Sequence, residues 1–313
     1  MFLRHRFERL FLLFIACSLL FYVSCQSGPE ETDGQCTVTF SVTNYRQTSF
    51  DDLSGSGTRA ETVISLSLAY LQVTIFNAET NEQVTTILHK SDDYYDENDK
   101  LKALLFPKFS VTLPYGHYRV LVLGFNGSRA CNIASPSCIT WADNYVPNTF
   151  LYQEEFTLNE GATLNKEITL RHVVATFCMM AEDVAPSNLK KMRFISTAGG
   201  TVLDATTGYT PQSTGRTSEI DVPSKFLGIK DTFTVYLFLP EEQITTNYTV
   251  QALDKNNKVL SEKHFNDVPL RINYLTSWQG KMFEQGSEDV PSTQNGFSIQ
   301  WDMNWADTLK FEP

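Results

Sequence analysis

The sequence is poor in the features on which most enzymes and nucleic-acid-binding proteins depend. It contains no His-Glu-x-x-His motif, no Gly-x-Ser-x-Gly motif and no glycine-rich phosphate loop, and its five histidines are scattered. Basic residues are also scarce, since 25 Lys and Arg stand against 36 Asp and Glu. The net charge of −11 disfavours nucleic acid, whose phosphates attract clustered basic side chains. We therefore predict a protein that is not an enzyme, needs no cofactor and binds no nucleic acid.

Clusters of side chains spaced to bind a metal ion are rare in the sequence as well. One acidic run carries carboxylates close together, at Asp92, Asp93, Asp96, Glu97 and Asp99. Such oxygen ligands suit calcium, but the run lacks the central glycine and the terminal glutamate of an EF-hand loop. We therefore interpret it as a solvated loop and predict no metal site.

Long apolar runs are absent except near the N-terminus. Residues 11–24 form an apolar run that follows Arg4, Arg6 and Arg9. The run is shorter than the about 20 residues that a bilayer-spanning helix needs. A basic segment followed by a run of this length is typical of a signal peptide, so we predict that residues 1–24 are removed on export.

The residue after the predicted cut is a cysteine. Ser24 followed by Cys25 fits the site at which a lipoprotein signal peptidase cuts, which leaves the Cys25 sulfur free to carry a lipid. Tyr22 stands where an aliphatic residue is more usual, and an ordinary secreted protein with an incidental cysteine is the alternative. Residues 25–35 are polar and acidic with Gly and Pro, which predicts a flexible, lipidated tether.

The other cysteines of the predicted mature chain fall into two kinds. Cys131 and Cys138 are close enough in sequence for a disulfide across a short loop, which an exported protein allows. Cys36 and Cys178 each lie in an apolar, strand-like run. We predict that these two are small buried hydrophobic residues.

Hydrophobic periodicity predicts an all-β protein. Residues 36–42 alternate strictly, and their apolar positions share one face, as expected of a half-buried strand. Short strand patterns separated by turn signals continue to the C-terminus, without convincing amphipathic helices. The alternation changes phase around Arg171. We therefore predict two tandem β-sandwiches, an N-terminal one at residues 36–170 and a C-terminal one at residues 171–313.

One turn signal predicts a particular pairing. Residues 109–113 and 118–122 both alternate, and Pro114-Tyr115-Gly116 lies between them. Proline presets φ and glycine permits a positive φ at a tight reversal. We therefore predict that the two strands form a hairpin.

The last strand pattern, residues 297–305, has a large apolar residue at every odd position and a polar residue at every even one. The apolar side chains are Phe297, Ile299, Trp301, Met303 and Trp305. Full burial of five such side chains contributes on the order of 10 kcal/mol of transfer free energy before ordering costs. Residues 284–296 before them are polar, so the strand can reach beyond its own core. It is either the final strand of its own sandwich or a strand that inserts into a neighbouring subunit.

Several stretches in this order resemble the FimB/Mfa2 family of fimbrial subunits of Bacteroidales, which belong to the type V pilus system. The resemblance covers nearly the whole predicted mature chain, and no single motif is specific. The stretches are residues 36–45, 49–53, 113–118 (Leu-Pro-Tyr-Gly-His-Tyr), 143–152, 173–177, 203–208 (Leu-Asp-Ala-Thr-Thr-Gly), 239–240 and 269–280.

The resemblance implies transthyretin-like sandwiches, lipidation at Cys25 and display on the outer face of the outer membrane. The acidic residues Glu30, Glu31 and Asp33 resemble the signal that sends such lipoproteins outward. The implied partners are fimbrial stalk subunits, joined by strand exchange.

Within this resemblance the chain is either an anchor or a processed subunit. An anchor keeps its lipid and its first strand and donates its last strand, residues 297–305. A tip or polymerising subunit is instead cut by an Arg- or Lys-specific protease, for which Arg46 and Arg59 are the candidates. From another class, a surface glycan- or ligand-binding lipoprotein stays open, with Trp141, Tyr145 and Tyr152 as candidate aromatic platforms, although packing inside the protein is the favoured role for these rings.

Overall fold

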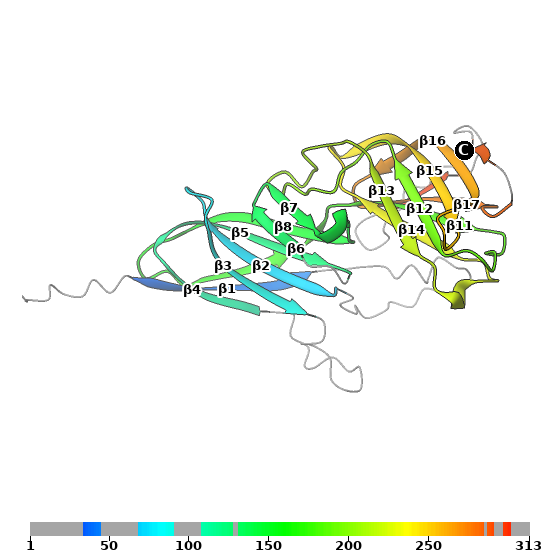
Figure 1. Ribbon diagram of the computed structural model, residues 1–313. Helices are drawn as coiled ribbons and strands as arrows, with labels where there is room; N and C mark the ends of the chain where they lie inside the picture. Colours follow the sequence, from blue (N-terminus) through cyan, green and yellow to red (C-terminus); the bar gives the residue numbers. More distant parts are fainter. Residues whose placement is uncertain are drawn as a thin grey trace, which may run out of the picture.

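The computed structural model describes residues 34–44, 68–90, 108–127, 131–284, 287–290 and 297–301 (Figure 1). Strands make up nearly all of the regular structure, so the all-β prediction is confirmed. The helical elements among the described residues are two short 3-10 segments, η3 (Ala142–Asn144) and η4 (Ser224–Phe226).

The N-terminal half of the fold is built from two facing sheets. The smaller sheet has the strand order β4 (Lys108–Pro114), β1 (Gln35–Asn44), β9 (Leu164–Thr169). The larger sheet has the order β10 (Arg171–His172), β8 (Thr149–Leu158), β5 (Gly116–Phe125), β2 (Tyr70–Asn77), β3 (Gln83–Lys90). Apolar side chains of both sheets meet in one core, which includes Phe40, Val73, Val120 and Phe150.

The C-terminal half is built in the same way. One sheet has the order β14 (Thr232–Leu237), β11 (Ala175–Ala181), β17 (Tyr274–Gly280), β19 (Phe297–Trp301). The other has the order β13 (Arg216–Asp221), β12 (Lys191–Ser196), β15 (Gln243–Leu253), β16 (Val259–Arg271), β18 (Ser287–Val290). Aromatic side chains fill the core between them: Phe177 lies against Phe194, Tyr248 and Phe265, and Phe265 lies against Trp278.

The two halves repeat one chain path. β1 pairs antiparallel with β4 and parallel with β9, and β11 likewise pairs antiparallel with β14 and parallel with β17. The opposite sheets correspond too, because β3-β2-β5-β8 and β13-β12-β15-β16 follow the same order. The prediction of two β-sandwiches is therefore confirmed, with β9 and β17 in equivalent places. The predicted residue limits of the two domains stay a prediction.

The predicted hairpin around Pro114-Tyr115-Gly116 is wrong. β4 pairs with β1, whereas β5 pairs with β2 and β8, so the turn carries the chain from one sheet to the facing sheet. Both strands still point an apolar face into the same core, through Phe109 and Tyr118 among others. The alternation in the sequence is the same for a hairpin and for a crossing of this kind, so it could not separate them.

The cysteines are all thiols in the described part of the chain. Cys36 and Cys178 are fully buried, as predicted. Cys131 and Cys138, whose spacing in the sequence allowed a disulfide, are both free thiols. The two residues lie on paired strands, β6 (Cys131–Ser135) and β7 (Cys138–Trp141), but Cys131 is opposite Trp141 and Cys138 is opposite Ser135. This offset along the ladder exceeds the about 7 Å between Cα atoms that a disulfide can span.

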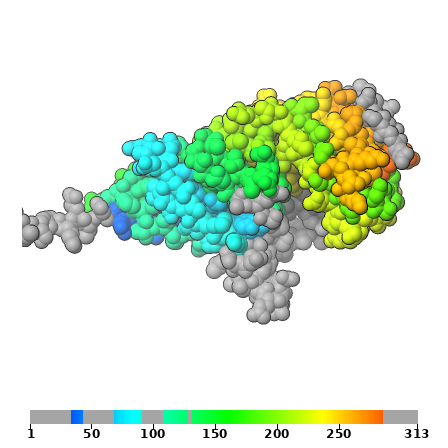
Figure 2. Space-filling model, in the orientation of Figure 1, coloured from blue at the N-terminus to red at the C-terminus, as the bar shows by residue number. Residues whose placement is uncertain are grey.

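The β6–β7 hairpin lies where the two halves meet (Figures 1 and 2). Ile139 and Leu203 exchange two backbone hydrogen bonds of 2.9 Å, and the Ala205 amide donates to the Pro136 carbonyl. The hairpin therefore joins the outer side of the N-terminal sandwich to a loop of the C-terminal half.

Candidate functional site

The first strand, β1, lies in the middle of its sheet. Its inward side chains, Cys36, Val38, Phe40 and Val42, are between 0% and 3% exposed. The ring of Phe40 meets that of Phe156 edge-on, with 5.8 Å between centroids. The alternation read from the sequence is thus realised completely, because one face of β1 packs into the core and the other faces outward.

Both edges of β1 are paired along most of their length. Seven residue pairs connect it to β4, from Gln35–Pro114 to Ser41–Lys108, and the parallel ladder to β9 runs from Val38–Leu164 to Asn44–Thr169. Two hydroxyl contacts reinforce the β4 side on the outer face, Thr39 to Ser110 at 3.0 Å and Thr37 to Thr112 at 3.4 Å. Removing β1 would open a groove along the sandwich, with the β4 and β9 backbones as its walls.

The last strand described, β19, lies at an edge. It pairs antiparallel with β17 through five residue pairs, from Trp278–Phe297 to Tyr274–Trp301. It ends the sheet order β14-β11-β17-β19. The first part of the predicted donor strand, with Phe297, Ile299 and Trp301, therefore has its backbone on its own sandwich.

Several predicted site residues lie outside the described residues. These are the lipidation site Cys25, the candidate cleavage sites Arg46 and Arg59, the donor-strand residues Met303 and Trp305, and the acidic run at residues 92–99. Each of these predictions stays a prediction.

The three candidate aromatic platforms have different surroundings. Trp141 is 3% exposed and stacks on Phe238 with 5.6 Å between ring centroids, so packing is its role, as the sequence favoured. Tyr145 packs against the same cluster. The Tyr152 hydroxyl donates to the Glu154 carboxylate, which also pairs with Lys166. Trp141 is therefore not available to stack on a sugar ring.

The contacts between the two halves were missed at the level of the sequence. The cluster around Trp141, called the junction cluster below, combines strands of the N-terminal half with loops of the C-terminal half. Its buried members are Phe76, Leu121, Leu123, Phe125, Ile139, Trp141, Val146, Leu151, Val173, Val174, Leu203, Ala205 and Phe238. One signal was present, since Val120-Leu121-Val122-Leu123 is a continuous apolar run, typical of a strand buried on both faces.

A second missed feature is the buried histidine at the junction. His172 is 7% exposed and stacks on Phe150, with Nε2 at 2.5 Å from Oδ1 of Asn148 and Nδ1 at 3.1 Å from Oδ1 of Asn273. Asn273 lies in the turn before β17, and its backbone N–H donates to the Val174 carbonyl. Burial lowers the pKa of His172 from 6.5 to about 4, although the hydrogen bond with Asn273 acts in the opposite direction.

This depressed pKa predicts an acid-sensitive junction. Between pH 6.5 and about 4 the unfolded chain binds a proton at His172 that the folded chain excludes, so the free energy of unfolding falls as the pH falls. The total loss from this group is about 3 kcal/mol. Urea unfolding at a series of pH values measures it, with His172→Gln as the non-titrating control. Parallel pH profiles for the two proteins would contradict the assignment.

Within the described residues, no group of three His, Cys, Asp or Glu side chains is placed to hold a metal ion. The His117 side chain is 40% exposed, and its Nε2 lies 3.4 Å from a Glu155 oxygen. In the same part of the chain, no helix is long and apolar enough to cross a membrane.

One family model matches the sequence. It describes a family of unknown function, DUF6562, and it covers residues 140–310, more than half of the chain. The chain belongs to this family. The matched region runs from the β6–β7 hairpin to beyond β19, so it contains the C-terminal sandwich. Among curated proteins, none matches the sequence.

Solved structures similar to the chain include proteins from Bacteroides ovatus and Porphyromonas gingivalis. A protein from Bacteroides ovatus provisionally described as an adhesin is 11% identical, over 74% of this chain and 82% of its own, with a TM-score of 0.43. The tip fimbrial protein Mfa3 from Porphyromonas gingivalis is 10% identical, over 85% and 98%, with a TM-score of 0.39. The fimbrial anchor protein Mfa2 from the same species is 10% identical, over 78% and 90%, with a TM-score of 0.37. Two of these three are fimbrial subunits, the kind of protein that the sequence resembles.

Proposed function

We propose that the chain is a cell-surface fimbrial subunit that anchors a type V pilus to the outer membrane. In this function Cys25 carries the lipid, residues 26–34 form the tether and the two sandwiches form the body. The partner is a fimbrial stalk subunit, which receives residues 297–305 as an added strand. Backbone hydrogen bonds supply the affinity of such a strand, and its alternate side chains fill pockets in the acceptor.

The observation that carries this proposal is the contrast between the first and the last strand. β1 is paired on both edges, and its inward side chains are fully buried, so it completes its own sandwich. β19 is paired by β17 at the end of its sheet and follows a polar segment. In a chain that keeps β1, this strand occupies the groove that a donor strand from a neighbour would otherwise fill. The last strand, by contrast, is held by one ladder, so only that ladder must break before the strand can pair with another subunit. This is the arrangement expected of a donor.

The decisive experiment removes the last strand. Deleting residues 297–313 is expected to release pili from the cell surface, because the donated strand is lost, while the protein itself remains on the membrane. Electron microscopy of cells and immunoblotting of shed pili measure this. If pili remain anchored to cells of the deletion strain, the proposal is wrong.

A matched pair of substitutions separates strand pairing from a general effect of deletion. Ile299→Asp places a charge at an apolar position of the alternating pattern, and Ser298→Asp places the same charge at a polar one. We expect Ile299→Asp to impair anchoring and Ser298→Asp to leave it nearly intact, because only odd side chains fill acceptor pockets. The first residue of the surface-purified protein then decides between roles: a start at Cys25 supports the anchor, and a start just after Arg46 or Arg59 indicates a tip or polymerising subunit.

A further inference from the structure

The internal repeat allows one sandwich to be compared with the other. In the C-terminal sandwich, β17 pairs with β11 on one side and with β19 on the other. In the N-terminal sandwich, the equivalent strand β9 pairs with β1 on one side, and the sheet order ends there. Within the described part of the chain, no strand occupies beside β9 the place that β19 occupies beside β17.

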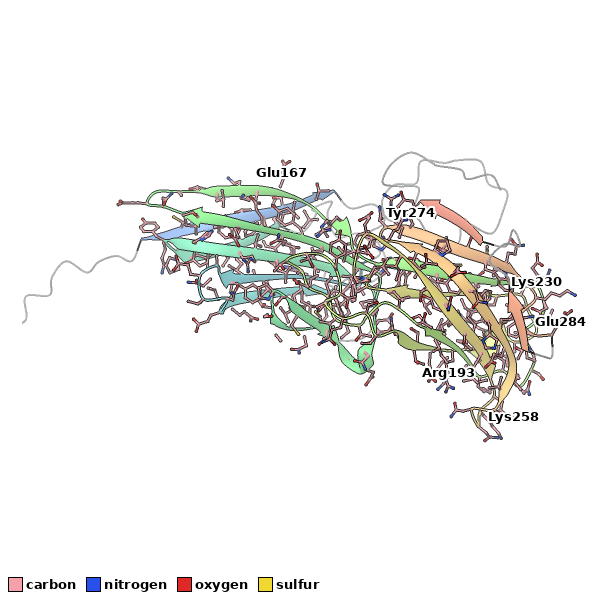
Figure 3. All side chains as sticks on the ribbon, turned by 90° about the horizontal axis from the view of Figure 1, so that it is seen from above. Glu167, Arg193, Lys230, Lys258, Tyr274 and Glu284 are labelled. Atoms are coloured by element: carbon pink, nitrogen blue, oxygen red, sulfur yellow. The ribbon has the colours of Figure 1, made fainter. Side chains whose placement is uncertain are left out.

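The side chains of β9 are more exposed than those of β17, in agreement with the missing neighbour beside β9 among the described strands. The first five residues of β17, Tyr274–Trp278, are all buried. Along β9, by contrast, Asn165, Glu167 and Thr169 are exposed and alternate with less exposed residues. Figure 3 shows the Glu167 side chain pointing away from the body of the protein, at the rim of the sheet. β9 therefore behaves as an edge strand at which sheet pairing stops.

The charged side chains of β9 do not prevent a further strand from pairing at its outer edge. Lys166 points toward the facing sheet, where its amine pairs with Glu154 of β8. Burial raises the pKa of Glu154, but the hydrogen bonds from Lys166 and Tyr152 and the attraction to Lys166 outweigh it and lower this pKa, so the Glu154 carboxylate is charged at neutral pH. The lysine, which commonly protects an edge strand, is thus satisfied inside its own sandwich, and Glu167 is the one charge on β9 that faces solvent.

We propose that the outer edge of β9 accepts residues 297–301 from a second copy of this chain. The occupant is argued from the chain itself, because this segment already pairs antiparallel with the equivalent strand of the C-terminal sandwich. Adding it beside β9 converts the order β4-β1-β9 into the four-stranded order already formed by β14-β11-β17-β19. The segment Phe297–Trp301 carries no charge that would oppose Glu167.

This addition differs from replacement of the first strand. β1 stays in place with its buried side chains, and the new ladder forms on the far side of β9. Since the donor edge and the acceptor edge are different surfaces, the contact is head-to-tail and can continue from copy to copy. The inference rests on the proposed function in one respect, because it uses the same C-terminal strand as the donated element.

Cross-linking between two single variants tests the contact. One full-length chain carries Glu167→Cys on β9, the other carries Ser298→Cys, and a short bismaleimide joins them after mixing. Only an intermolecular contact joins the two labels, and peptide mass spectrometry distinguishes the product from those of the natural thiols. Val84→Cys replaces Glu167→Cys as the matched control, because Val84 is 44% exposed on β3, the edge strand of the other sheet.

The expected result is a cross-link from position 298 to position 167 and little or none to position 84. Hydrogen exchange of the unmodified chain is the second measurement: the β9 amides are expected to exchange at least about tenfold more slowly at high than at low protein concentration. Equal labelling of positions 167 and 84, or β9 exchange that is independent of concentration, would overturn the inference. If the cross-link is absent but pili remain anchored, this inference is wrong and the proposed function is unaffected. If the cross-link forms but the protein does not associate with pili, the proposed function is wrong and this inference is unaffected.

Discussion

Replacing Phe40 with alanine is expected to lower the free energy of unfolding by about 3–5 kcal/mol. The side chain is fully buried at the centre of β1, between the two sheets of the N-terminal sandwich and edge-on to Phe156. Truncation leaves a cavity that the surrounding strands can only partly fill, because β1 is held on both edges. Since domains are commonly stable by only about 5–15 kcal/mol, a large share of the stability of this half is lost.

Urea unfolding followed by tryptophan fluorescence and circular dichroism measures this loss. Thr37→Ala is the matched control, since Thr37 lies on the same strand with its side chain on the exposed outer face. We expect its effect to stay within about 0.5–1 kcal/mol. If both variants lose the same stability, β1 does not pack as described.

Replacing Trp141 with alanine is the second substitution with a large expected effect, again about 3–5 kcal/mol. The indole lies between the two halves, stacked on Phe238 and edge-on to Phe125 at 5.5 Å between centroids. Its loss empties the centre of the junction cluster, so the two sandwiches are expected to unfold less cooperatively. Calorimetry detects this as a broadened or divided transition.

Trp141→Phe provides the control for this prediction. The Nε1 atom of Trp141 is buried without a hydrogen-bond partner among the described residues. An unsatisfied buried donor is costly, so removing it while keeping an aromatic ring offsets part of the lost packing. We expect Trp141→Phe to cost far less than Trp141→Ala. An equal cost for both variants would mean that the ring contacts do not hold the halves together.

Local sequence patterns were enough to predict where the strands lie, but not which strands pair with each other. The alternation at residues 36–42 predicted both the strand and its buried face, because burial of one face follows directly from the period of two. The turn at Pro114-Tyr115-Gly116 was predicted as a turn, yet the pairing across it was wrong, because sheet choice depends on strands that are distant in sequence. The proline and glycine fix the reversal and leave open which sheet each strand joins.

The candidate site was less predictable than the fold. The regular pattern at residues 297–305 indicated a strand able to pair, and the structure places its first part beside β17. That β9 ends its sheet among the described strands, whereas the equivalent β17 does not, emerges only when the two halves are compared as folds. His172 and the junction cluster were hidden for a related reason, since their burial depends on how one sandwich meets the other.

The parallel pairing of β1 and β9 has a mechanical consequence. The chain enters the smaller sheet of the N-terminal sandwich at Gln35, the start of β1, and leaves that sheet after Thr169, the end of β9, before the short β10 pairs with β8. Because the two strands run in the same direction, a pull between the N-terminus and the C-terminal half slides them past each other lengthwise. The backbone hydrogen bonds of that ladder are then loaded in shear and share the force, instead of opening one after another as in a peeled hairpin. The sandwich nearest the N-terminus is therefore built to resist tension along the long axis of the molecule.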